Sequence, residues 1–400
     1  MLNFVHIGIG QCGNRFAEQF GKNGRIALAV NTARIDMSSI NSKAINARNQ
    51  IHIALPDSPD GAGRDPEIGR ESMEANLEKV YDAIQKAIGD THVDRIALWA
   101  GLGGGTGTGG IIPLMKYLME KDLPLMLCLT IPRKKEGWLV RMNAFKALTD
   151  ITDELKASKR HIVPFLVIDN DKFIGSISAN NDLIARTLVR FTKTTNNVPT
   201  ESAFDDRDFN RLLGYKGMLT VVRTSISTDS LKGGDSFVQS IQESWKKSLY
   251  AKFDPAEAAG AANLVIVPSK FYQTKGNDLL IDENIETLDG IYPHANPYSC
   301  IYETKNNDID KIIIYTLLTG LPNPDENIDE MYDDISEQIS EDKARRKERS
   351  RAERAARAKR HVLEYDPNDD FDDDDDDNTS EDNDESEDMN RQDSEHRRLL

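Results

Sequence analysis

Short apolar runs alternate along the first part of the chain with stretches whose apolar residues recur every three or four positions. The short runs predict β-strands, and the longer stretches, such as 67–88 and 111–121, predict amphipathic helices. Alternation of this kind is typical of a parallel sheet with helices on both faces. The predicted strands of this part are Phe4–Ile9, Ile26–Asn31, Ile51–Leu55, Arg95–Ala100, Leu125–Ile131 and Ile162–Asp169.

The pattern changes after residue 178. A helical run leads to an acidic loop (201–208), and a later block carries predicted strands at Met218–Thr224, Asn263–Val267 and Ile312–Leu318. A charge-rich helix and an acidic tail follow, and the tail has too few apolar residues to fold. We therefore expect an α/β fold in five parts: a Rossmann-like first domain (1–178), a long central helix with its loop (179–214), a smaller α/β domain (215–322), a charged helix (323–364) and a disordered acidic tail (365–400).

Composition adds a charge asymmetry to this picture. The net charge of -17 is unevenly placed: residues 343–361 carry ten basic side chains against two acidic ones, and 366–388 carry fifteen acidic ones and no basic ones. No apolar run reaches the roughly 18 residues of a membrane span, and the N-terminus enters a strand without a basic flank. We therefore expect neither membrane insertion nor secretion. The three cysteines show neither metal spacing nor even pairing, which favours a reducing cytoplasm.

Two glycine-rich loops follow predicted strands. Residues 8–13 (GIGQCG) match G-x-G-x-x-G, which suits a turn where the backbone approaches a phosphate. On its own this motif also fits simple helix–strand packing. Taken with Asp36 after the second strand, it fits a nicotinamide-dependent oxidoreductase as well. All three interpretations stay open on this loop.

The second loop, 101–110 (GLGGGTGTGG), is more specific. Its small side chains leave backbone N–H groups free to wrap a di- or triphosphate, and Thr106 and Thr108 add hydroxyl donors. A flexible linker would not lie between a strand and a helix. The chain contains no G-x-x-x-x-G-K-[ST] motif, so a P-loop enzyme is excluded.

These loops resemble those of the tubulin/FtsZ superfamily. Residues 103–109 (GGGTGTG) are similar to its phosphate-loop motif, and residues 10–14, 30–33 and 61–70 resemble three further nucleotide loops in the family's order. The resemblance implies a GTPase that binds GTP or GDP with Mg²⁺, the ion having no dedicated protein ligands. The alternative interpretation as a nicotinamide-dependent oxidoreductase does not explain the second loop. The implied phosphate-binding residues are Gly10, Gln11, Cys12, Gly13, Gly63, Gly103, Gly104, Gly105, Thr106, Gly107, Thr108 and Gly109.

Other matching positions imply contacts to the ribose and base. An amide or carboxylate facing guanine would reject adenine, because adenine would leave those buried groups unpaired. Either Asp182 or Asn181 fits the central-helix residue that pairs with the base, although both could simply cap that helix. The implied residues are Asn31, Glu136, Arg141, Asn170, Asn181 and Asp182.

The resemblance also implies a catalytic loop that acts on the next subunit. Asp205 and Asp208 fall on the family's two acidic positions, with Asp206 as a neighbouring alternative. Carboxylates can orient water for in-line attack; the alternative is an aspartate-rich helix cap. Nucleotide and acids on opposite faces would meet only in head-to-tail contacts, and contacts that do not close into a ring give open filaments.

The charged end resembles the plasmid- and phage-encoded TubZ group. That resemblance implies a cytoskeletal filament in the cytoplasm of a bacterial host that segregates plasmid or phage DNA. A phage spindle and FtsZ-type division are the alternatives. The expected partners are further copies of the chain, and DNA or a DNA-binding adaptor contacted through 343–361. This basic segment could instead pair with the acidic tail or be solvated.

Overall fold

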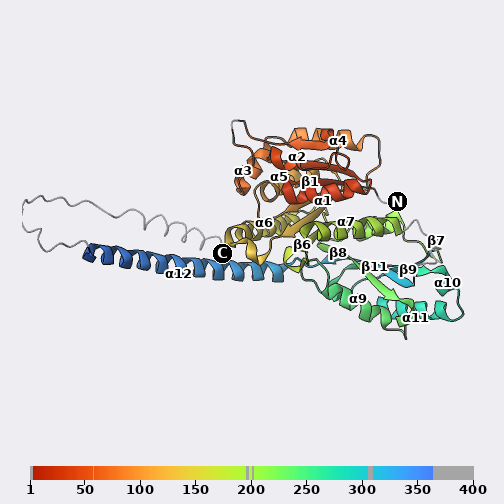
Figure 1. The fold of residues 1–400 in the computed structure, drawn as a ribbon. Coiled ribbons are helices and arrows are strands. Elements are labelled where there is room, and N and C mark those ends of the chain that lie inside the picture. The colour runs from red at the N-terminus through yellow and green to blue at the C-terminus, as the bar shows by residue number, and fades with distance from the viewer. Residues whose placement is uncertain (1–2, 57, 195–197, 201, 305–309, 364–400) are drawn as a thin grey trace, which may run out of the picture. The chain divides into compact units, whose positions relative to one another are not determined.

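The computed structural model describes residues 3–56, 58–194, 198–200, 202–304 and 310–363, with side chains up to residue 356 (Figure 1). The chain forms two compact units, one ending at Glu341 and one beginning at Asp342. The predicted acidic tail, 365–400, lies outside the described residues. No described helix combines the length and the apolar character needed to cross a bilayer.

In the described residues, eleven strands form one sheet in the order β3-β2-β1-β4-β5-β6-β8-β11-β9-β10-β7. The pairs from β3 through β6 are parallel, whereas β11 is antiparallel to both of its neighbours. The strands are β1 Phe4–Ile9, β2 Ile26–Asn31, β3 Gln50–His52, β4 Arg95–Gly101, β5 Leu125–Ile131, β6 Phe165–Asp169, β7 Val198–Pro199, β8 Met218–Ser227, β9 Gly260–Pro268, β10 Tyr298–Thr304 and β11 Lys311–Leu321.

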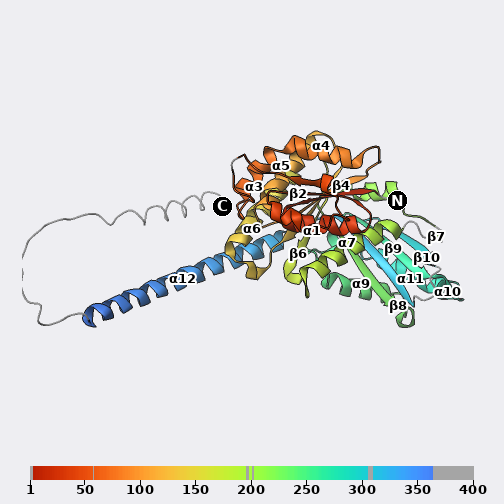
Figure 2. The same cartoon turned by 45° about the horizontal axis from the view of Figure 1, so that its top comes forward.

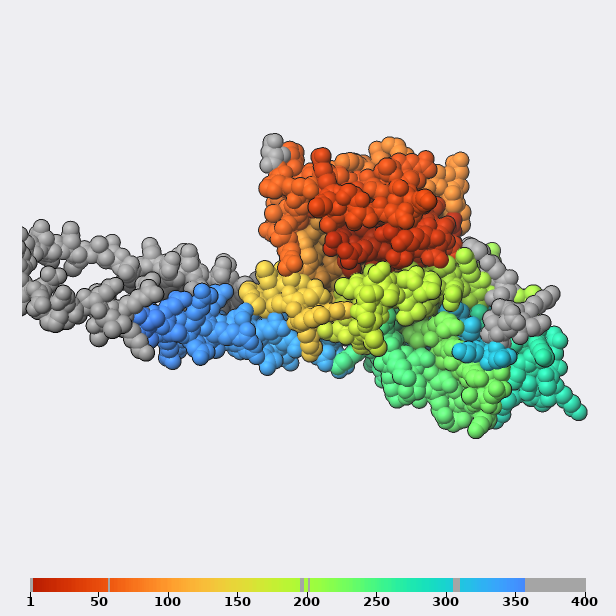
Figure 3. Space-filling view, in the orientation of Figure 1, coloured from red at the N-terminus to blue at the C-terminus, as the bar shows by residue number. Residues whose placement is uncertain are grey.

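The helices connect these strands and cover the sheet (Figure 2). Helix α7 packs against α1 on one side and β8 on the other. In the space-filling view its yellow-green surface lies between the red-orange first part and the green second part (Figure 3). The helices are α1 Gly10–Lys22, α2 Arg34–Ser38, α3 Pro66–Glu74, α4 Leu77–Ile88, α5 Thr106–Glu120, α6 Trp138–Ala157, α7 Ile177–Thr194, α8 Asp206–Leu212, α9 Ser236–Lys246, α10 Ser269–Tyr272, α11 Asn277–Asp289 and α12 Asp325–Leu363, with short 3-10 turns that include η2 Lys134–Glu136 and η3 Asn170–Lys172.

The predicted α/β fold is confirmed, and the central strands explain why the sequence revealed it. Every residue of β1 and of β5 is buried, as expected for parallel strands covered on both faces. The two halves of the sheet join where Phe165 of β6 pairs with Met218 of β8. Residues up to Glu341 form one compact unit, so the expected boundaries at 178 and 214 stay predictions.

Several local predictions were wrong: the predicted strands Ile51–Leu55 and Ile162–Asp169, for example, are the shorter strands β3 and β6. The predicted helix 67–88 is two helices, because Asn76 leaves helical geometry and donates its side-chain amide to the carbonyl of Ser72. The predicted helix 111–121 begins earlier, since the glycines and threonines from Thr106 onward form its first turns. Strand β10 was not predicted; it is only partly buried and mixes polar with apolar residues.

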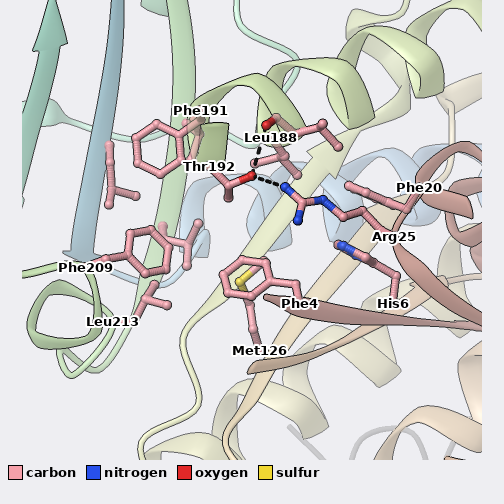
Figure 4. Close-up of a pocket in the computed structure, with 14 residues that line it drawn as sticks. Phe4, His6, Phe20, Arg25, Met126, Leu188, Phe191, Thr192, Phe209 and Leu213 are labelled. Atoms are coloured by element: carbon pink, nitrogen blue, oxygen red, sulfur yellow. Dashed lines mark hydrogen bonds between the residues drawn. The ribbon is translucent and has the colours of Figure 1, made fainter. Parts of the chain in front are cut away.

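A small apolar cavity lies beneath the sheet, between β1, α1, α7 and α8 (Figure 4). Its volume is about 20 Å³, which is room for little more than a water molecule. Arg25 crosses it and donates to the hydroxyl of Thr192 at 2.9 Å. This cavity is part of the core and is too small for a nucleotide.

The ring of His6 is enclosed in the same region. It stacks on Phe20, and its Nδ1 accepts a hydrogen bond from Trp99 Nε1 at 3.1 Å. Burial, and secondarily the positive charge of Arg25, hold the pKa of His6 well below its ordinary value. The folded protein therefore keeps this imidazole neutral.

Acid should destabilise the fold through His6. The unfolded chain binds the proton below about pH 6.5 and the folded chain resists it, so the free energy of unfolding should fall by up to about 1.4 kcal/mol per pH unit below that point. Urea denaturation at about pH 7 and about pH 5 should therefore show a smaller loss for His6→Gln than for the parent chain. A control, His92→Gln, changes a side chain that is 88% exposed and should keep the parental slope. Equal slopes for all three proteins would contradict the assignment.

Candidate nucleotide site

A cavity of about 510 Å³ opens at the carboxyl ends of the parallel strands. Its walls are the segments that follow β1, β2, β4, β5 and β6, together with the loop before α3. This is where open α/β sheets bind ligands. The predicted site residues that line it are Gly10, Gln11, Cys12, Asn31, Gly63, Gly103, Gly104, Gly105, Thr106, Gly107, Glu136 and Asn170.

The amino ends of two long helices meet at this cavity. Helix α1 begins at Gly10, whose φ is +71°, and α5 begins next to Gly105, after Gly103 with a φ of +107°. A Cβ added to Gly10 would lie 2.8 Å from the amide nitrogen of Gly107, so the two helix ends are in direct contact. Their unpaired N–H groups and helix dipoles favour an anion. The cavity can therefore hold a phosphate chain with backbone donors.

Three predicted phosphate residues shape the cavity without lining it. A Cβ on Gly13 would lie 2.0 Å from the carbonyl oxygen of Trp99, and one on Gly109 would lie 1.8 Å from that of Pro66. Thr108 accepts a hydrogen bond from the Gly103 amide at 2.9 Å. These residues hold the helices and the loop in place.

A hydrogen-bonded network crosses one wall. The hydroxyls of Thr32 and Thr106 are 2.6 Å apart, and Thr106 also donates to Asn31 Oδ1 at 3.3 Å. The amides of Asn31 and Gln11 donate to the two oxygens of Asp36 at 3.2 and 3.1 Å. Asp36 thus fixes the rotamers of two predicted ligands.

Several lining residues were not predicted as ligands. Thr32 and Arg64 lie inside loops that the sequence singled out, and Asp36 was weighed only for the oxidoreductase. Thr130 is the penultimate residue of β5, and its hydroxyl oxygen lies 3.4 Å from the Cys12 sulfur. Burial raises the pKa of the Cys12 thiol, so it stays protonated and neutral beside the phosphate positions.

Other predicted base and ribose residues do not line the cavity. Arg141 is buried and its guanidinium donates to Asp334 of α12 at 2.7 Å. Asp182 pairs with Arg186. Asn181 is 1% exposed, and neither polar atom of its side chain has a hydrogen-bond partner within the described parts of the chain.

The two predicted catalytic aspartates lie away from the cavity and cap α8. Asp205 Oδ1 accepts from the amides of Arg207 and Asp208, and Asp208 Oδ2 accepts from the amide of Asp205. Helix α7 runs between Asn170 at the cavity and this cap, and its 18 residues span about 27 Å. The structure therefore does not bring these carboxylates to the phosphate positions of the same subunit. Across the described residues, no group of three or more His, Cys, Asp or Glu side chains is arranged to hold a metal.

A parallel α/β sheet with an anion cavity between two helix amino ends defines a nucleotide-binding protein of the Rossmann-like class. Residues 3–178 match the Tubulin/FtsZ family, GTPase domain. These residues are a GTPase domain of this family, and the protein is a GTPase.

The similarity to individual members extends over most of the chain. It is 25% identical over 366 residues to the tubulin-like protein TubZ of Bacillus cereus, across 81% of this chain and 80% of the relative. It is 27% identical over 344 residues to CetZ of Pyrococcus furiosus, across 81% and 82%. The fold is similar to that of TubZ-Bt in a helical model of its two-stranded filament, with a TM-score of 0.74 and 21% identity over 88% of this chain and 92% of that one. It is also similar to the GDP-bound CetZ1 monomer of Haloferax volcanii, with a TM-score of 0.66 and 22% identity over 84% of this chain and 99% of that one.

Substitutions at two glycines should distinguish an effect on nucleotide binding from an effect on the stability of the fold. A Cβ on Gly104 meets nothing within 4 Å and would extend into open space, so Gly104→Ala should fold normally but weaken binding of a fluorescent GTP analogue at least about tenfold. Gly13→Ala should instead lower the free energy of unfolding by about 2 kcal/mol, because its methyl group collides with Trp99. Urea denaturation and equilibrium binding measure the two effects. Normal affinity for Gly104→Ala would mean that the phosphates lie elsewhere.

Proposed function

We propose that this GTPase assembles head to tail into filaments and hydrolyses GTP where neighbouring subunits meet. The observation that carries the proposal is the separation of the nucleotide cavity from Asp205 and Asp208 by the length of α7. One subunit supplies the phosphate cradle, and the acidic cap of α8 in the next subunit supplies the carboxylates. The similar TubZ of Bacillus thuringiensis is known as a GTPγS-form protofilament (TM-score 0.69, 21% identity, 87% of this chain and 94% of that one).

In this proposal the base is guanine. Asn170 lines the cavity, and Asn181 on the first turns of α7 has a buried amide whose two polar atoms find no partner in the described residues. A buried unpaired amide costs about 1–3 kcal/mol, and the polar edge of guanine would offset that cost once the side chain of Asn181, which does not line the cavity here, turns toward the base. Adenine lacks the 2-amino group of guanine and would leave one of these hydrogen bonds unmade.

Mg²⁺ would enter with the nucleotide and neutralise the phosphate charge. The carboxylate of Asp36 and the amide of Gln11 lie in the phosphate cavity and suit the hydrated form of this ion, which keeps several of its waters. Asp205 and Asp208 of the neighbouring subunit would accept hydrogen bonds from the attacking water and align it with the γ-phosphate.

We further propose that the filament moves plasmid or phage DNA in the bacterial cytoplasm. The support is the basic segment 343–361, whose described part is helical and exposed, and the similarity to TubZ. The segment would contact DNA phosphates directly or through a DNA-bound adaptor.

Hydrolysis should depend on assembly. The GTPase rate per subunit should rise steeply once the protein concentration passes the threshold at which light scattering reports filaments. Asp205→Asn and Asp208→Asn should still assemble and should release little phosphate, because Asn caps a helix as well as Asp but lacks the carboxylate.

Asp206→Asn is the matched control for these variants. Asp206 lies in the first turn of α8, between the two capping residues, and its change should leave turnover near the parental rate. A rate per subunit that is flat across the assembly threshold would refute hydrolysis between subunits. Rapid turnover by both capping variants would refute their catalytic assignment.

DNA capture by filaments should depend on the basic segment. Changing the exposed Arg346, Lys347 and Arg351 to Gln preserves helix propensity and removes three charges. The variant should co-sediment less DNA with filaments, and the slope of log affinity against log salt should become shallower by about 0.9 for each DNA phosphate that is no longer neutralised. The control Glu348→Gln makes the segment more basic and should not weaken capture. Parental DNA capture and salt slope in the triple variant would contradict direct binding of DNA by this segment.

A further inference from the structure

We propose that Asp334 of α12 is a positioning residue for the base and ribose wall of the nucleotide cavity, so that docking of the first turns of α12 and nucleotide binding strengthen each other. The inference rests on the proposed binding of GTP in this cavity. It concerns residues 325–341, which lie in the same compact unit as the cavity.

Asp334 is held between two cations. Its carboxylate accepts a hydrogen bond from Arg141 at 2.7 Å and pairs with Lys134 Nζ at 3.1 Å. The side chains of Arg141 and Asp334 are 3% and 19% exposed, so water screens this pair only weakly. Without Asp334, the partners left to Arg141 among the described residues would be the Pro132 carbonyl, at 3.4 Å, and the more distant carboxylate of Asp171, at 3.6 Å.

The backbone of Lys134 and the neighbouring Arg133 connect this ion pair to the wall of the cavity. The amide of Lys134 donates to both oxygens of Asp171 at 3.0 Å, and Arg133 Nε donates to the carbonyl of Asn170 at 3.1 Å. Asn170 itself lines the cavity, and so does Glu136, whose carboxylate accepts from the Arg133 amide at 2.9 Å. The turns η2 and η3, which carry the two lining residues, are thus tied to each other and to α12.

A second contact from α12 holds the start of η3, at its capping residue Asp169. The amide of Asn327, which is buried, donates to Asp169 Oδ2 at 3.5 Å and accepts from the Lys252 backbone amide at 2.7 Å. The other oxygen of Asp169 caps η3 by accepting from the amide of Asp171 at 3.0 Å. The first turns of α12 therefore contact η3 at its cap and, through Arg141, at its middle.

This arrangement makes α12 part of the binding site without touching the ligand. If η2 and η3 lose their support from α12, Glu136 and Asn170 lose their fixed positions, and binding must first restore that order. Thermodynamic linkage makes the coupling reciprocal, so bound nucleotide must also stabilise the docked helix. The helix carries a comparison residue, because Glu330 pairs with Lys252 and, among the described side chains, makes no hydrogen bond or ion pair with η2 or η3 themselves.

The test uses the full chain below its assembly threshold, with fluorescent GDP as the probe and unlabelled GDP and IDP as competitors. Asp334→Ala should weaken GDP binding about tenfold. It should also reduce the preference for GDP over IDP, which lacks the 2-amino group, because Asn170 would no longer be fixed against the base. Asp334→Glu should restore most of the affinity. Glu330→Ala, on the same helix, should match the parent chain. A general loss of stability would weaken both competitors equally.

Hydrogen exchange on the parent chain gives a second measurement that does not depend on a variant folding. Saturating GDP should slow exchange of the amides in residues 325–341. Unchanged exchange there, or parental GDP affinity in a folded Asp334→Ala, would overturn the inference. Failure of the parent chain to bind GDP would instead overturn the proposed function itself, so the two failures are distinguishable.

Discussion

The structure depends most on backbone contacts that only glycine permits. Helix α1 approaches the carbonyl of Trp99 at Gly13, and α5 approaches α3 at Gly109, with no room for a Cβ at either point. These two contacts bring the amino ends of both helices to the place where Gly10 meets Gly107. Because phosphate would be bound there mainly by backbone N–H groups, the missing side chains create the site as well as the packing.

The opposite wall of the cavity, formed by η2 and η3, is held by side-chain contacts and not by close approaches of the backbone. Its backbone turns are short, and they are held by Asp334 and Asn327 from α12, a helix late in the chain. Arg141 and Asp334 are 193 residues apart in sequence, yet they form the central contact of this wall. The predicted phosphate side is therefore fixed by local sequence within the GTPase domain, whereas the proposed base side is completed only when the chain has folded as far as α12.

This difference explains what could be predicted from the sequence. Strands β1, β2 and β5 were predicted with their observed ends, because continuous burial leaves an uninterrupted apolar run. The glycine loops were found because phosphate binding leaves a local signature. Arg141 was expected at the ribose, and instead it faces α12, since nothing in the spacing of its own loop reveals a partner so distant. Asp205 and Asp208 fit both a cap and a catalytic pair, and the structure shows the cap.

The cap is also the reason why a single subunit is a poor catalyst in the proposed mechanism. Asp205 and Asp208 hold the first turn of α8, whose Phe209 packs against Phe4, Phe191 and Phe204. Moving the acids toward the phosphates of their own subunit would break this aromatic cluster and cross the length of α7. A second copy can present the same cap unchanged. The rigid packing that keeps the two halves of the site apart within one chain thus favours completing it between chains.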